Sequence, residues 1–376
     1  MTHFPICRAT AEIDTDALIH NFRTLRMLAE AHAHIADPPP RVIAVVKANA
    51  YGHGLSLVVP ALLSAGCDFF AVATTDEALS VRLLAPDADI LILGYTPPTD
   101  VPLLIGHRLL QCVFSLDYAK ALNAEAAEQA ACLSVHLKID GGMCRLGFRP
   151  DELSALTALS SLSHLRPVGI FTHFPSADTE KDATRDAITR FLTCRSTLYR
   201  YGLPPLFTHA AASAALLAMP EETVLCGVRP GIALYGISPV STSLPLRPVL
   251  RLSAPLVDLH EAEAGTPIGY GGSFTTARRS RIGICAIGYG DGLPRRLRGY
   301  RVTLLHGNQR FFAPIVGHIC MDYTLLDLTN TPAEVGDTVL LFDDPTPISA
   351  ACGTIPYEIL TGISARVKRT RKGESL

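Results

Sequence analysis

One lysine stands at the end of an apolar stretch, where it could react as an amine. Residues 42–46 are all apolar, and Lys47 follows directly, before a run of small and polar residues. A lysine at a strand end ordinarily extends its ammonium group to solvent. The alternative is a partly desolvated amine, which loses its proton more easily and can form a Schiff base. These residues alone leave both interpretations open.

Other polar side chains stand at the same place after later apolar runs. Asp140, His173 and His209 each directly follow such a run. In a barrel of parallel strands these positions lie around one mouth, where active sites form. A histidine at a strand end is also often structural, so the pattern by itself does not assign a role.

The elements that would position these residues form an alternating pattern between residues 41 and 236. The apolar runs that we expect to be strands are residues 42–46, 69–73, 90–93, 111–114, 134–139, 168–172 and 206–208. Amphipathic stretches, such as residues 76–84, 117–131 and 182–201, lie between them. This alternation predicts parallel strands joined by crossover helices, and about eight such units would close a barrel.

The pattern changes after Pro239 to short strands separated by Gly, Pro and Asp turns. We expect strands at residues 281–287, 301–305, 324–328 and 338–342, and residues 8–13 could add another. The predicted fold is therefore an α/β protein with a TIM-like (β/α)8 barrel, residues 12–239, followed by a mostly β C-terminal domain. Residues 1–11 and 240–376 would form that second domain.

Composition limits the class of partner. The chain has 376 residues, with 33 basic and 35 acidic side chains, so its charge does not indicate binding to nucleic acid or to an anionic membrane. A small-molecule substrate is expected. The ten cysteines include no CxxC pair, which favours reduced thiols over a zinc site and predicts no metal. With no pattern of a secretory signal at residues 1–14, we expect a cytoplasmic protein.

Several long motifs resemble the alanine racemase family. VVKANAYGHG, residues 45–54, is similar to the family's cofactor-lysine motif, and further segments match in the same order along nearly the whole chain. They are HLKIDGGMCRLG from His136, THFPSAD from Thr172, VRPGIALYG from Val228, GYGGSF from Gly269, IGYGDG from Ile287, GHICMD from Gly317 and PYEILTGISARV from Pro356. The resemblance implies the barrel, the β domain and pyridoxal 5'-phosphate as cofactor.

The resemblance implies two catalytic bases, Lys47 and Tyr270. Lys47 would hold the cofactor and exchange the substrate α-proton on one face, and Tyr270 of the partner subunit would serve the other face. Racemization needs two bases because one cannot reach both faces of a planar centre. The family's site is shared between the subunits of a homodimer. His173 would lie in the cofactor site and orient that tyrosine.

The remaining implied residues bind the cofactor or the substrate. Arg229 would face the pyridine nitrogen, and because a guanidinium only donates, that nitrogen would stay an unprotonated acceptor. The implied phosphate-binding residues are Tyr51, Ser213, Gly231, Ile232 and Tyr357. Arg145 would approach the substrate carboxylate, and Met321 would offer it a backbone N–H. Lys138 is the family's possible carbamylation site, where a carbamate would accept hydrogen bonds from Arg145.

Three positions depart from the family pattern: Ala212 where asparagine is usual, Gly290 where alanine is common, and Lys368 where proline is found. Ala212 removes a polar contact near the phosphate and predicts weaker cofactor binding. The expected activity is interconversion of L-alanine and D-alanine, which in a bacterium supplies D-alanine for peptidoglycan.

Other functions stay open. A serine or broad-specificity racemase shares this scaffold. A basic amino-acid decarboxylase usually has a glutamate in place of Arg229, and a non-catalytic cofactor-binding protein lacks the β domain.

Overall fold

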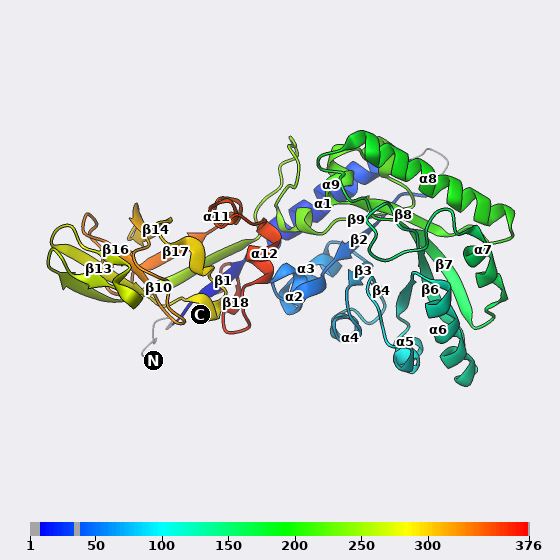
Figure 1. Ribbon diagram of the computed structural model, residues 1–376, viewed down its shortest axis with the longest axis horizontal. Helices are drawn as coiled ribbons and strands as arrows, with labels where there is room; N and C mark the ends of the chain where they lie inside the picture. The colour runs from blue at the N-terminus through cyan, green and yellow to red at the C-terminus, as the bar shows by residue number, and fades with distance from the viewer. Residues whose placement is uncertain (1–7, 34–37, 375–376) are drawn as a thin grey trace. The chain divides into compact units, whose positions relative to one another are not determined.

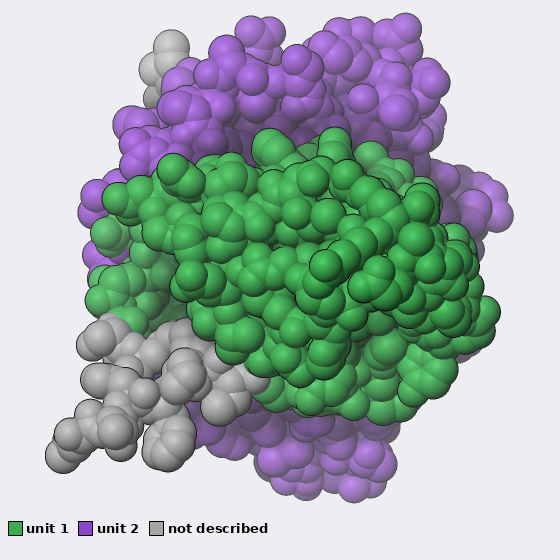
Figure 2. All heavy atoms as spheres, turned by 90° about the vertical axis from the view of Figure 1, so that its left-hand side faces the viewer, with its two compact units in different colours: residues 1–17, 51–57, 248–376 green, residues 18–50, 58–247 purple. Residues whose placement is uncertain are grey.

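The computed structural model describes residues 8–33 and 38–374, which form two compact units. Unit 1 comprises residues 1–17, 51–57 and 248–376, and unit 2 comprises residues 18–50 and 58–247 (Figure 2). Residues 1–7 and 375–376 of the segments that we assigned to the β domain lie outside the described residues, as do residues 34–37.

Unit 2 is built on a closed barrel of eight parallel strands, which confirms the predicted fold class. The strands are β2 (Arg41–Val45), β3 (Phe69–Val72), β4 (Asp89–Ile92), β5 (Leu110–Val113), β6 (Leu133–Lys138), β7 (Leu165–Phe171), β8 (Phe207–Ala212) and β9 (Gly227–Arg229). Parallel pairing of Arg41 with Gly227 and of Val42 with Val228 closes the barrel between β2 and β9. The apolar runs therefore become strands because their side chains are buried on both faces of a parallel sheet.

One helix precedes the first barrel strand and the others come after barrel strands; α6, α7 and α8 can be seen outside the barrel in Figure 1. Their bounds are α1 (Thr15–Ala31), α2 (Lys47–Tyr51), α3 (Leu55–Ser64), α4 (Thr75–Leu84), α5 (Val101–Gly106), α6 (Leu116–Glu128), α7 (Leu153–Thr157), α8 (Lys181–Arg200), α9 (Ser213–Ala218) and α10 (Pro220–Thr223). Helix α8 buries Ala187, Phe191, Cys194 and Leu198, whose spacing of three and four residues places them on one face. None of the described helices is both long and apolar enough to cross a membrane.

Unit 1 contains an eight-stranded sheet. Its strands are β1 (Thr10–Ile13), β10 (Leu250–Ala262), β13 (Ser280–Cys285), β14 (Arg301–His306), β15 (Gln309–Pro314), β16 (Thr324–Asp327), β17 (Thr338–Phe342) and β18 (Lys368–Arg371). Strand β10 is long and changes register between Leu256 and Asp258, so it pairs with β1 and β17 along one part and with β13 along the other.

Smaller elements complete unit 1. Strands β11 (Pro267–Ile268) and β12 (Phe274–Thr275) form a separate pair, and the 3-10 turns include η4 (Tyr270–Gly272) and η5 (Tyr289–Asp291). Helices α11 (Thr346–Ala351) and α12 (Pro356–Thr361) precede the last strand. Strand β1 lies between β10 and β18, so the described part of the N-terminal segment does add a strand to this mostly β unit.

Candidate active site

Lys47 directly follows Val46 after strand β2, where the chain takes an unusual backbone conformation. Ala48, Asn49 and Ala50 have φ values of 52°, 52° and 55°, in the left-handed region. A non-glycine residue there costs roughly 1–2 kcal/mol, so the surrounding structure must hold this turn in place. The Glu77 carboxylate contributes by accepting hydrogen bonds from Ala48 N–H at 2.6 Å and Ala73 N–H at 2.8 Å. It thereby joins the turn after β2 to the end of β3.

The surroundings of the Lys47 amine favour its neutral form. Burial lowers the pKa of Lys47, and the positive charge of Arg145 lowers it further, while the negative charge of Glu77 raises it in part. The net direction is down. Lys47 is therefore closer than an ordinary surface lysine to the unprotonated state in which an amine is a nucleophile or a base.

His173 follows strand β7 and is the point where several predicted site residues come together. Burial lowers the pKa of His173 to about 3, and the positive charges of Arg229, Arg145, Lys138 and Lys47 each contribute. The imidazole is therefore neutral at ordinary pH and able to accept a hydrogen bond. The structure thus brings all four basic residues that we predicted for the site close to one neutral histidine within unit 2.

Lys138, at the end of β6, experiences the same concentration of positive charge. Burial lowers the pKa of Lys138, and Arg145 and Arg229 lower it further, while Cys112 and Asp140 raise it in part. Its ammonium nitrogen also lies 5.8 Å from the centre of the Phe171 ring. A lysine in these surroundings is more easily unprotonated, which is the form that reacts with carbon dioxide.

Arg229 ends strand β9 with its guanidinium fixed by three hydrogen bonds. It donates to His209 Nδ1 at 2.7 Å, to the Thr172 carbonyl at 2.6 Å and to the Ala210 carbonyl at 2.9 Å. Burial lowers the pKa of Arg229 to about 9, so the side chain is still charged at neutral pH. The residue is 4% exposed, and these acceptors leave it one orientation.

The Arg229 contact also sets the proton positions of two buried histidines. A guanidinium only donates, so His209 Nδ1 accepts and its proton must be on Nε2. That Nε2–H then donates to His136 Nδ1, 2.9 Å away. Burial, together with the charge of Arg229, lowers the pKa of His136 to about 3 and moves the pKa of His209 in the same direction. Both rings are neutral: His209 accepts from Arg229, and His136 accepts from His209.

A small polar group lies where helix α9 begins. Ser213 Oγ accepts hydrogen bonds from Gly231 N–H at 3.0 Å and Ala233 N–H at 3.2 Å, which leaves its own O–H to donate elsewhere. Within the described chain, the Ile232 N–H has no hydrogen-bond acceptor. The Ser213 O–H and the Ile232 N–H are therefore two neighbouring donors that could bind an anion, while the Gly231 N–H is taken up by Ser213 Oγ.

The other predicted residues belong to unit 1. Tyr51 and Tyr357 lie with ring centres 6.1 Å apart, and burial, with Tyr357 close by, raises the pKa of Tyr51. Its phenol is therefore a neutral hydrogen-bond donor. Tyr270 begins the η4 turn and is 70% exposed, while Met321 is 52% exposed. Both residues belong to unit 1, whereas the basic residues around His173 belong to unit 2.

Comparison with known proteins finds a matching family domain for each part of the chain. Residues 13–239 match the family model of the alanine racemase N-terminal domain, and residues 249–371 match the alanine racemase C-terminal domain. The chain belongs to the alanine racemase family.

Members of this family match the chain along its whole length. Alanine racemase of Clostridium novyi is 36% identical over 96% of this chain and 94% of that protein. The crystal structure of alanine racemase from Bacillus anthracis with bound L-Ala-P has a TM-score of 0.88 and 33% identity, and covers 99% of this chain and 97% of that one. That of the Bartonella henselae enzyme with covalently bound pyridoxal phosphate has a TM-score of 0.84 and 29% identity, covering 97% and 100%.

Sequence reasoning missed two residues that support this site in the family fold. Glu77 stands three positions after Thr74, which caps helix α4, so the T-x-x-E pattern of a capping box was present. Its carboxylate instead reaches the amide that follows Lys47. His136 is a polar residue inside an apolar strand, a pattern that indicates a buried partner without identifying His209.

Proposed function

We propose that this chain is a pyridoxal-phosphate-dependent alanine racemase, interconverting L-alanine and D-alanine. The observation that carries the proposal is Lys47, a strand-end amine with a lowered pKa in a chain that matches alanine racemases throughout. The relatives' bound L-Ala-P and covalently bound pyridoxal phosphate support the same assignment.

The residues present fit this cofactor. A reactive amine at Lys47 suits its aldehyde, the Ser213 O–H and the Ile232 N–H beside Gly231 suit its phosphate, and the Arg229 guanidinium suits a ring nitrogen that accepts. Tyr51 and Tyr357 supply further phenol donors. When bound, pyridoxal phosphate withdraws electrons from the amino acid and so acidifies its α-hydrogen. Arg229 limits that withdrawal because it leaves the ring nitrogen unprotonated, which disfavours side reactions.

Two bases hold and move the α-proton in this proposal. Lys47 Nζ exchanges the proton on one face of the α-carbon, and the Oη of Tyr270 of the partner subunit exchanges it on the other. Neutral His173 accepts a hydrogen bond from that phenol and so orients it. Arg145 and the Met321 N–H bind the substrate carboxylate, and a carbamate on Lys138 would orient Arg145.

The proposal includes a homodimer, because Tyr270 and Met321 are exposed in unit 1 and Lys47 is in unit 2. A head-to-tail arrangement would complete two equivalent sites. We place this enzyme in the cytoplasm, and in a bacterium it would supply D-alanine for peptidoglycan.

Exchange of the α-hydrogen in deuterated water tests the function directly. The protein with added pyridoxal phosphate should convert L-alanine to D-alanine carrying deuterium at the α-carbon. Lys47→Ala and Tyr270→Phe should each lower that rate by at least about a hundredfold, as expected for loss of a proton-transfer group. L-serine and basic amino acids serve as parallel substrates. Faster formation of D-serine than of D-alanine would overturn the alanine assignment. Release of carbon dioxide from a basic amino acid would indicate a decarboxylase.

A further inference from the structure

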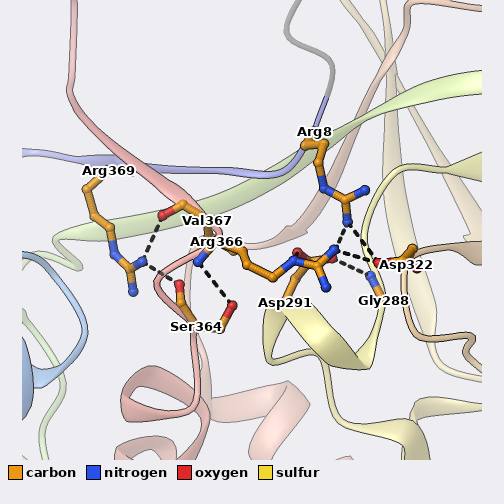
Figure 3. Close-up of polar contacts among 8 residues, drawn as sticks. All are labelled: Arg8, Gly288, Asp291, Asp322, Ser364, Arg366, Val367 and Arg369. Atoms are coloured by element: carbon orange, nitrogen blue, oxygen red, sulfur yellow. Dashed lines mark hydrogen bonds and ion pairs between the residues drawn. The ribbon is translucent and has the colours of Figure 1, made fainter.

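Unit 1 contains a buried carboxylate, Asp291, that is not among the proposed active-site residues. Asp291 ends the η5 turn and is 1% exposed. Its Oδ2 accepts hydrogen bonds from Arg8 Nη2 at 2.8 Å and from Gly288 N–H at 2.9 Å, and its Oδ1 lies 3.3 Å from Arg366 Nε (Figure 3). A carboxylate excluded from water needs such partners, since an unpaired buried charge is strongly destabilising.

The same two arginines extend the contact to a second carboxylate. Arg366 Nη2 donates to Asp322 Oδ1 at 2.5 Å, and Arg8 Nη2 lies 3.8 Å from that oxygen. We call Arg8, Asp291, Asp322 and Arg366 the Asp291 cluster. It joins three segments far apart in sequence to the η5 turn: the start of the described chain, the loop containing Met321, and the segment before β18.

The η5 turn binds the Met321 loop through its backbone as well. Tyr289 N–H donates to the Cys320 carbonyl at 3.0 Å, and Gly290 N–H donates to the Met321 carbonyl at 2.9 Å. The contact is close, because a Cβ on Gly288 would lie only 2.3 Å from the Met321 oxygen. The loop therefore rests directly on a turn whose shape Asp291 fixes.

These bonds set the direction of the Met321 N–H. The Cys320 carbonyl and the Met321 N–H belong to one planar trans peptide unit, so they point in opposite directions. Since the carbonyl points at the η5 turn, the N–H must point away from it. Within the described chain this N–H has no hydrogen-bond acceptor. It is therefore a fixed donor directed outward.

We propose that Asp291 and Arg366 are positioning residues, which aim the Met321 N–H at the substrate carboxylate. This inference rests on the proposed function, in which Met321 binds that carboxylate. In this proposal neither side chain touches the substrate. Asp291 shapes the η5 turn, and Arg366 pairs with both Asp291 and Asp322, the neighbour of Met321. Removal of either should loosen the loop without altering Lys47 or Tyr270.

The first test measures the loop itself. Asp291→Asn, Arg366→Met and Arg366→Lys would be compared with Arg279→Met, a control that removes an exposed arginine of unit 1 paired with Glu261. Hydrogen–deuterium exchange at the Tyr289 and Gly290 amides should become at least about tenfold faster in Asp291→Asn and Arg366→Met, and stay unchanged in the control. Arg366→Lys keeps the positive charge but loses the planar guanidinium that binds two carboxylates, so its exchange rate should lie between those of Arg366→Met and the control. Unchanged exchange in the first two variants would overturn the proposal.

The second test measures substrate binding in the dimeric enzyme with cofactor. Loss of one well-aimed hydrogen bond to a carboxylate should raise the KM for alanine about tenfold and leave kcat within about twofold. A lowered kcat with unchanged KM would indicate general loss of structure and would contradict the proposal. If Asp291→Asn does not fold, Arg366→Lys decides by the same split. If wild-type protein racemizes no amino acid, the proposed function fails and the inference fails with it; if wild type is active and only the KM effect is absent, the inference alone fails.

Discussion

At the scale of single residues, Lys47, the proposed catalytic lysine, depends on a carboxylate that belongs to the next βα unit. Glu77 accepts hydrogen bonds from Ala48 and Ala73 amides, and its charge opposes the effect of Arg145 on the pKa of Lys47. It therefore has two effects: it holds a strained turn, and it moderates how far the amine is deprotonated. The two effects can be separated by substitution.

Glu77→Gln keeps the size of the side chain but removes its charge. Without the carboxylate, the pKa of Lys47 should fall further, because the negative charge that raises it is gone. In cofactor-free protein, modification of Lys47 by an amine-reactive reagent should therefore reach half its maximal rate at a lower pH than in wild type. Asp76→Asn, at the neighbouring exposed carboxylate, is the control. A midpoint that moves upward, or equally in both variants, would contradict this role.

At the scale of elements, most regular parts of the barrel follow from sequence, whereas its irregular parts and the long strand β10 do not. The predicted strand at residues 42–46 and helix at residues 182–201 are within a residue or two of β2 and α8. The eighth barrel strand, β9, was missed because its three residues, Gly227–Arg229, are too few to show a pattern. The left-handed turn at Ala48 was unpredictable, since alanine has no preference for that conformation. Long-range contacts hold it there.

Ala212 shows how a departure from the family pattern acts on an element. It occupies the N-cap of helix α9 in extended conformation and makes no side-chain cap. Ala212→Asn should supply that cap and raise the free energy of unfolding by about 0.5–2 kcal/mol, measured by urea titration of cofactor-free protein. The same variant should bind pyridoxal phosphate more tightly. Ala214→Asn, inside the helix, should be destabilising instead. Equal effects of the two changes would rule out capping.

At the scale of the whole molecule, the proposed shared site predicts how much activity mixed dimers should have. Lys47→Ala and Tyr270→Phe chains should each be nearly inactive alone. After subunit exchange of an equal mixture, half of the dimers contain one chain of each kind, and one of their two sites has both wild-type residues. Activity should then recover to about a quarter of wild type. Recovery no greater than the sum of the separate variants would show that each site is formed within one chain.

Stability of the whole chain should depend on pH through the buried histidines of the barrel. His136 stays neutral in the folded state down to its pKa of about 3, whereas in the unfolded chain it takes up a proton below its ordinary pKa of 6.5. Between these values the unfolded chain binds more protons, so the free energy of unfolding falls as pH is lowered. For this group alone the loss at pH 5 is about 2 kcal/mol.

His136→Asn removes this titration while keeping an oxygen near the place of Nδ1, where His209 donates. The variant should be less stable than wild type at pH 7, because it leaves a cavity, yet lose less stability on going from pH 7 to pH 5. Urea unfolding of cofactor-free protein at pH 7 and pH 5 measures this loss of stability for each variant. His107→Asn, at an exposed histidine, should show the wild-type slope. If His136→Asn also kept that slope, the acid sensitivity would have to come from His209 and His173, the other two barrel histidines whose pKa is depressed.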